Sequence, residues 1–240
     1  MLSKHLLMWC KWKKMMTPSF LFYRIGLICV LSISQYSCSS SFEIIDRPII
    51  FSENRVSMTK KYIDNHYGKI VDNIEITPKI VVIHYTFIPT TEGSFQAFYN
   101  EELPNSRTDL KKESQLNVSV QFLVSPEGNI YRLMPENHMA RHVIGLNYNS
   151  IGIENVGGTE DTPLTRPQIR ANKYLVKYLA DKHPIEYVIG HSQYQNFEGH
   201  NLWLEKNQNY RTTKVDPGRK FLKKIHQKAQ KLNLKTTADE

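Results

Sequence analysis

Residues 80–86 read Ile-Val-Val-Ile-His-Tyr-Thr, a β-branched run that ends in polar side chains at His84 and Thr86. A continuous run of this kind is typical of a strand that is buried on both faces of a sheet. Mainly apolar runs at residues 150–156 and 187–189 predict two more strands of the same sheet. The sequence therefore predicts a buried sheet whose central strand ends at a histidine.

The segments around this sheet predict a hairpin and three helices. Residues 118–124 and 130–134 flank the turn Pro-Glu-Gly-Asn at 126–129, and they are predicted to pair as neighbouring strands. Apolar periodicity and helix-start residues predict helices over 90–99, 164–182 and 218–234. Strands and helices alternate after one hairpin, so we predict an α/β fold in which a mixed central β-sheet is flanked by helices.

Composition sets the broad class of protein. The chain has 240 residues, of which 40% are hydrophobic and 11% aromatic, enough for one domain with a real core. We expect an N-terminal arm at 38–74, the folded domain at 75–232 and a tail at 233–240. The net charge of +8 comes partly from a C-terminal run spaced like the solvated face of a helix. We therefore expect no nucleic-acid partner, and we expect a monomer.

The N-terminal residues 1–37 have the pattern of an export signal. Lysines precede a mostly apolar run at 19–34, and small residues follow it. The run is short and is interrupted by Arg24, which argues against a permanent transmembrane helix. Cys38 resembles the modified cysteine of a bacterial lipoprotein, although Gln35 and Tyr36 differ from the usual residues of such signals. We expect an exported protein, either periplasmic or attached to a bacterial outer membrane through a lipid on Cys38.

Two histidines stand at similar places in the predicted sheet. His84 ends one strand and His191 follows another, and ligand groups gather outside strand ends in open α/β sheets. Each histidine alone is better explained as structural, but their matching placement favours a shared site. All three cysteines lie before residue 40, so any further metal ligand there has to be a carboxylate. Asp216 is one candidate, although Asp-Pro-Gly is also an ordinary helix-start sequence.

Other polar residues are less clear from the sequence alone. Glu154 lies in an otherwise apolar strand, where it faces either solvent or a site, since burial without a partner is costly. His142 is a candidate for lining a cleft, and Lys214 alone would be a solvated lysine. The remaining histidines lack such a context and are predicted to be surface residues: His66, His138, His183, His200 and His226.

Taken in order, these motifs resemble the zinc-dependent N-acetylmuramoyl-L-alanine amidases of the AmpD type, which are related to peptidoglycan recognition proteins. The resemblance covers roughly residues 75–230, and its motifs are specific only as a set. It implies that residues 75–232 are an amidase domain that cleaves the bond between N-acetylmuramic acid and L-alanine. The implied partner is peptidoglycan or muropeptides, in wall turnover or remodelling.

The resemblance also assigns roles to individual residues. It implies that Zn²⁺ is held by His84, His191 and Asp216. Glu154 matches the family's strand glutamate, a candidate general base, and Lys214 matches a lysine that would stabilise the oxyanion. His142 matches a histidine that contacts substrate. A non-catalytic peptidoglycan-binding protein on the same fold is the alternative, and such relatives commonly lose a metal ligand.

The sequence departs from this family in three places. Arg141 stands where the family usually has an aromatic residue, and Gln121 stands where many relatives have histidine. The stretch at 192–213 is longer than in compact members and is rich in aromatic residues. It is interpreted as a loop that offers aromatic surface to a sugar or stem peptide, the alternative being that these side chains pack the loop itself.

Overall fold

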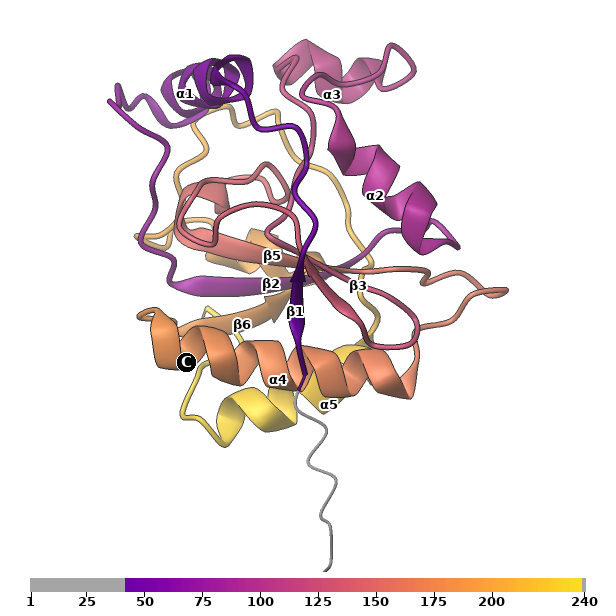
Figure 1. Cartoon of the computed structure of the whole chain (residues 1–240). Coiled ribbons are helices and arrows are strands. Elements are labelled where there is room, and N and C mark those ends of the chain that lie inside the picture. Colours follow the sequence, from indigo (N-terminus) through magenta and orange to yellow (C-terminus); the bar gives the residue numbers. More distant parts are fainter. Residues whose placement is uncertain (1–41, 239–240) are drawn as a thin grey trace, which may run out of the picture. The chain divides into compact units, whose positions relative to one another are not determined.

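A six-stranded sheet with helices on both faces forms the part of the chain that the computed structural model describes, residues 42–238 (Figure 1). The strands are β1 (Ile44–Asp46), β2 (Ile80–Tyr85), β3 (Phe122–Val124), β4 (Ile130–Arg132), β5 (Ser150–Asn155) and β6 (Tyr187–Gly190). The helices are α1 (Glu53–Tyr67), α2 (Thr91–Tyr99), α3 (Thr108–Glu113), α4 (Arg166–Lys182) and α5 (Arg219–Gln230). Two 3₁₀ segments, η1 (Asn147–Asn149) and η2 (His191–Phe197), adjoin β5 and β6.

The sheet is mixed, as predicted. Its strand order is β1-β4-β3-β5-β2-β6. The predicted hairpin of β3 and β4 supplies the antiparallel pair, and the other neighbouring strands run parallel. Because β2 lies between β5 and β6, it is covered on both edges as well as both faces, which explains its uninterrupted apolar run.

The register of the central strands brings three chemically active residues to one edge. His84 of β2 lies opposite Glu154 of β5, and Ile83 lies opposite both Ile153 of β5 and Gly190 of β6. His191 directly follows Gly190. Since parallel strands present their carboxyl ends at the same edge of the sheet, both histidines and the glutamate emerge there together.

Two layers of helices enclose the sheet (Figure 1). Helices α4 and α5 cover one face, where Leu175 and Leu179 of α4 and Ile225 of α5 join one hydrophobic core. Helix α4 begins at the predicted cap, since Thr165 Oγ1 accepts a hydrogen bond of 3.2 Å from the Gln168 amide. Helices α1, α2 and α3 lie on the other side.

The N-terminal part of the described chain contains more secondary structure than the arm that was predicted there. Residues 42–74 contain β1, which extends the sheet in parallel with β4, and the 15-residue helix α1. Helix α1 begins at the Ser52 cap and ends at Gly68, which has a left-handed backbone conformation. The strand predicted at 118–124 is shorter, because Ser119 donates its amide to the Arg141 carbonyl instead of a strand.

Some predictions concern residues that lie outside the described part. These are the export signal at 1–37 and the lipid attachment at Cys38. Within residues 42–238, no helix combines the length and the apolar character needed to cross a membrane.

Candidate active site

His84, His191 and Asp216 meet at the carboxyl edge of the sheet. The Nδ1 atoms of the two histidines are 2.9 Å apart. Asp216 Oδ2 lies 3.1 Å from His191 Nδ1 and 3.3 Å from His84 Nδ1. All three side chains are buried, and the Ser192 amide holds the Asp216 carbonyl at 2.9 Å. Three separate segments thus direct one donor atom each at a common point.

This arrangement fits a divalent metal such as zinc. Ligand atoms bound at about 2.0–2.2 Å to a tetrahedral zinc lie about 3.3–3.5 Å from one another, within a few tenths of an ångström of these separations. Burial, together with the nearby His84, lowers the pKa of His191 to about 4, so its imidazole is neutral at pH 7. Burial opposes ionisation of Asp216, but the adjacent imidazoles of His191 and His84 keep its pKa below the usual range. Both groups are therefore in the form that binds metal.

A chain of hydrogen bonds sets the proton positions on His84. Its Nε2 lies 3.0 Å from His142 Nδ1, and His142 Nε2 lies 3.2 Å from Ser150 Oγ. The Ser150 hydroxyl donates to the Leu146 carbonyl at 2.8 Å, so it accepts from His142 Nε2–H. Burial, with His84 and His191 adjacent, holds the pKa of His142 well below its ordinary value. Neutral His142 therefore accepts from His84 Nε2–H, and Nδ1 is the ring nitrogen of His84 that faces the metal position.

His142→Ala is expected to lower zinc affinity by about 10- to 100-fold, the range typical for loss of a group that orients a metal ligand. The reason is that His84 loses the acceptor that selects its tautomer. Zinc affinity is measured by competition with a chelating dye, which requires no substrate. His138→Ala is the control, since His138 is outside this chain of hydrogen bonds, and equal zinc affinity in both variants would contradict the assigned role.

Glu154 and Lys214 lie beside the three converging side chains. Glu154 Oε2 is buried and has no hydrogen-bond partner among the described residues. Burial, reinforced by the negative charge of Asp216, raises the pKa of Glu154 well above its ordinary value, and the charge of Lys214 opposes this shift. A carboxylate with a raised pKa is suited to accept a proton near neutral pH. The family resemblance predicted both residues at this site, and both lie beside it in the structure.

A cleft of about 230 Å³ opens over these residues. Its lining includes the predicted site residues together with side chains from the three helices above the sheet, such as Tyr62, Phe98 and Leu110. His142 lines the cleft as well, and its contact with substrate stays a prediction. The cleft therefore lies on the face of the sheet opposite α4 and α5 (Figure 1).

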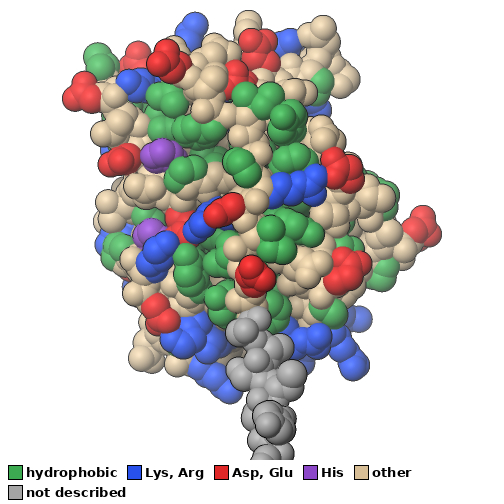
Figure 2. Space-filling model, in the orientation of Figure 1, with side chains coloured by type: hydrophobic (Ala, Val, Ile, Leu, Met, Phe, Trp, Pro, Cys, Tyr) green, Lys and Arg blue, Asp and Glu red, His purple; other side chains and the backbone are tan. Residues whose placement is uncertain are grey.

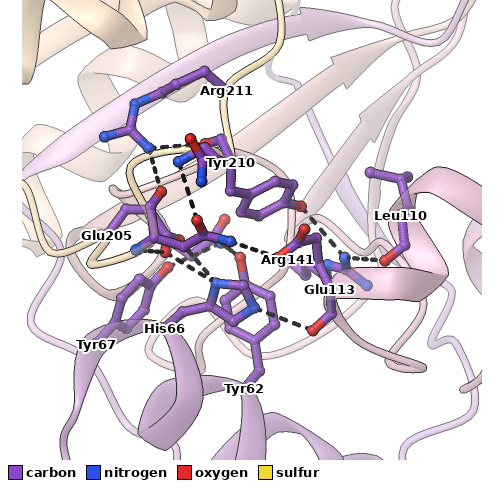
Figure 3. Close-up of polar contacts among 12 residues, drawn as sticks. Tyr62, His66, Tyr67, Leu110, Glu113, Arg141, Glu205, Tyr210 and Arg211 are labelled. Carbon is purple, nitrogen blue, oxygen red and sulfur yellow. Dashed lines mark hydrogen bonds and ion pairs between the residues drawn. The ribbon is translucent and has the colours of Figure 1, made fainter.

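Arg141 braces the wall of this cleft (Figure 3). Its guanidinium is buried and donates to the carbonyls of Leu110 at 2.9 Å and Ser114 at 3.1 Å, and also to that of Leu116. It also lies 3.3 Å from the Tyr210 hydroxyl. A long cation with several donors thus ties α3 and its following loop to the segment before Asp216. The departure from the family at this position has a structural role.

His66 is buried, contrary to the prediction that it lies on the surface. Its Nδ1 is 3.0 Å from Glu205 Oε2 and its Nε2 is 3.2 Å from the Glu113 carbonyl (Figure 3). These contacts join α1, the end of α3 and the 192–213 segment. The other four histidines predicted at the surface are all partly buried: His138, His183, His200 and His226.

The aromatic side chains of residues 192–213 mostly pack the segment itself. Tyr194 and Phe197 are fully buried against β2 and β6, and Tyr210 is buried beside them. Trp203 is half-buried against Gly145, where an added Cβ would approach the indole to 2.7 Å. Most of these aromatic side chains therefore pack the loop, as the alternative interpretation has it, while Tyr210 also lines the cleft. An aromatic contact with a sugar or stem peptide stays a prediction for Tyr210.

Gln121 is also structural. Its amide nitrogen donates to the His138 carbonyl at 2.8 Å, and its oxygen accepts from the Gly152 amide at 2.8 Å. It thus fixes β5 two residues before Glu154. No local sequence signal indicated this role, because both partners are distant in the chain.

Comparison with known proteins is consistent with the site. The family model described as Amidase_2, N-acetylmuramoyl-L-alanine amidase, matches residues 75–219. This range contains all six predicted site residues: His84, His142, Glu154, His191, Lys214 and Asp216. A search of curated proteins finds no match.

Several solved structures are similar. N-acetylmuramoyl-L-alanine amidase LysC from Clostridium intestinale URNW is 18% identical, with a TM-score of 0.50 over 81% of this chain and 100% of that chain. An AmpD derivative is 20% identical, with a TM-score of 0.47 over 78% of this chain and 94% of that one. Peptidoglycan recognition protein-LE, in complex with tracheal cytotoxin, is 16% identical, with a TM-score of 0.49 over 82% and 98%. At 18% identity, the similarity to LysC shows a shared fold.

Proposed function

The chain belongs to the N-acetylmuramoyl-L-alanine amidase family, and from this premise we propose that it is a zinc-dependent peptidoglycan amidase. It would hydrolyse the amide between the lactyl group of N-acetylmuramic acid and L-alanine of the stem peptide. The observation that carries the proposal is the convergence of His84 Nδ1, His191 Nδ1 and Asp216 Oδ2 beside the unpartnered carboxylate of Glu154. A site for structural support alone would not leave a buried carboxylate without a partner.

Each site residue has a defined part in this reaction. His84, His191 and Asp216 would hold Zn²⁺, which supplies a Lewis acid and a coordinated water of lowered pKa. Glu154 accepts the proton of the attacking water and returns it to the amine of L-alanine as the C–N bond breaks. Lys214 lies in the same cleft and stabilises the negative charge that develops on the carbonyl oxygen. The products are a peptide with a free amino terminus and a sugar with a free lactyl carboxylate.

Release of peptides from purified peptidoglycan tests this proposal. The protein is incubated with peptidoglycan alone, with a chelator, and with chelator followed by excess zinc. We expect peptides to be released in the first and third samples and not in the second. Sedimentation of the protein with peptidoglycan without any release would instead favour the non-catalytic binding protein.

We further propose that this reaction takes place outside the cytoplasm, in wall turnover or remodelling. The support is the export signal predicted at residues 1–37, where lysines precede an apolar run and small residues follow it. Cell fractionation tests the location, and metabolic labelling with a radioactive fatty acid tests lipid attachment at Cys38. Recovery of the protein solely from the cytosol would contradict both.

A further inference from the structure

We propose that the exposed face of α5 binds the surface of an anionic phospholipid bilayer. The helix Arg219–Gln230 carries five basic residues and no acidic one. Phe221, Leu222, Ile225 and Ala229 are buried against the core, so the basic residues occupy the outer side. Four of them are exposed: Arg219, Lys220, Lys223 and Lys224.

The charge on this face is not neutralised within the described part of the chain. Among the described ion pairs, the nearby ones join residues of α4: Lys177 pairs with Asp181, and Lys182 pairs with Glu136. None of the described ion pairs involves a lysine or arginine of α5. Two surface hollows border α5, of about 400 and 590 Å³, and no acidic side chain is among the described residues that line them. Figure 2 shows Lys and Arg side chains gathered along the lower edge of the view, over α4 and α5. Clusters of four or more basic residues on an amphipathic helix are typical of surfaces that bind anionic lipids.

The position of the first described residue favours a bilayer over other anionic partners. Phe42, the first described residue, packs its ring at 5.2 Å from that of Tyr174 on α4, which lies next to α5. The apolar run at 19–34 and Cys38 precede it. Four residues span at most about 14 Å, so a lipid on Cys38 would keep this side of the protein at the bilayer.

The position of the cleft agrees with this orientation. Besides the site residues at the carboxyl edge of the sheet, its lining includes side chains of α1, α2 and α3, which lie on the opposite face of the sheet from α5 (Figure 1). A bilayer under α5 therefore leaves the cleft uncovered. Basic groups at an anionic surface attract lipid headgroups within a Debye length, so the binding weakens as salt is added.

The test is binding of the full chain to vesicles of phosphatidylcholine alone or mixed with phosphatidylglycerol. The result is expressed as the ratio of the two affinities. In this ratio the contribution of the apolar N-terminal run cancels, because this run contributes to binding of both kinds of vesicle. K223E/K224E is expected to reduce this ratio by about 30-fold or more, since each basic residue at such a surface contributes about fivefold. K60E/K61E is the matched control: it replaces an adjacent lysine pair on α1, across the sheet, with the same change in net charge, and it should leave the ratio unchanged.

Further measurements keep the result interpretable. Circular dichroism melting of each variant verifies folding, and cleavage of a soluble muropeptide should be equal in wild type and K223E/K224E. Because vesicle binding needs no turnover, it stands or fails separately from the amidase proposal. Equal loss of binding in both double variants, or no preference for anionic vesicles, would overturn the inference. Tighter binding of a short DNA duplex than of anionic vesicles at the same salt would also overturn it.

Discussion

Replacing Glu154 with glutamine is expected to leave zinc bound and to lower the rate of amide hydrolysis by about 10²- to 10⁴-fold, the usual contribution of general acid–base catalysis. Glutamine has nearly the same shape but does not accept a proton at neutral pH. The measurement is kcat and kcat/KM on a defined muropeptide, together with zinc content per chain. Glu160→Gln is the control, since Glu160 is exposed in the loop after β5.

The same substitution has a predicted effect on stability. The folded-state pKa of Glu154 is raised, so its ionisation opposes folding at every pH above the ordinary carboxyl pKa. In the metal-free protein, Glu154→Gln is therefore expected to raise Tm at neutral pH and to leave it unchanged in acid. A lower kcat together with a higher Tm is the result expected if Glu154 serves catalysis as a proton acceptor at a cost in stability. Unchanged turnover, or loss of zinc along with turnover, would remove Glu154 from the assigned role.

Asp216→Ala is expected to abolish zinc binding and turnover together. Loss of a group that only supports a metal ligand lowers metal affinity by about 10- to 100-fold. Loss of the ligand itself is expected to lower it more. It also leaves His191 without the carboxylate that lies 3.1 Å from its Nδ1. Added zinc should raise Tm of the wild-type protein, because a ligand that binds only the folded state stabilises it, and it should not raise Tm of the variant.

Two comparisons separate this outcome from simple unfolding. Asp161→Asn, in an exposed loop, should respond to zinc as the wild type does. The circular dichroism spectrum of Asp216→Ala should match that of the metal-free wild type. Retention of zinc and activity in a folded Asp216→Ala protein would show that the metal ligands are assigned incorrectly.

The centre of the fold was predictable because its signals are local. The apolar run at 80–85 gives β2 at its observed bounds, and Thr165 marks the start of α4. Placing His84 and His191 at strand ends was enough to bring them together, because parallel strands share one edge. Glu154 was indicated as a carboxylate in an otherwise apolar strand and by the family resemblance, and the observed register places it opposite His84.

Helix α1 was missed because its buried side is largely polar or aromatic. Arg55, Thr59, Tyr62 and His66 face the interior, which gives little apolar periodicity. The Ser52 cap and Gly68 were the local signals that could have located it. The partners of His66 could not be predicted from local sequence, because Glu205 is 139 residues away. Burial of the aromatic residues at 192–213 was likewise undetermined, since irregular segments have no periodicity that separates packed from exposed side chains.

The most direct test of the account is mass spectrometry of the products from one defined muropeptide, with and without a chelator. The account predicts two products, a peptide that begins with L-alanine and a sugar that carries the free lactyl carboxylate. Their masses should sum to the substrate plus one water, and the reaction should stop with chelator and resume with zinc. Recovery of intact muropeptide bound to the protein, or cleavage at any other bond, would contradict it.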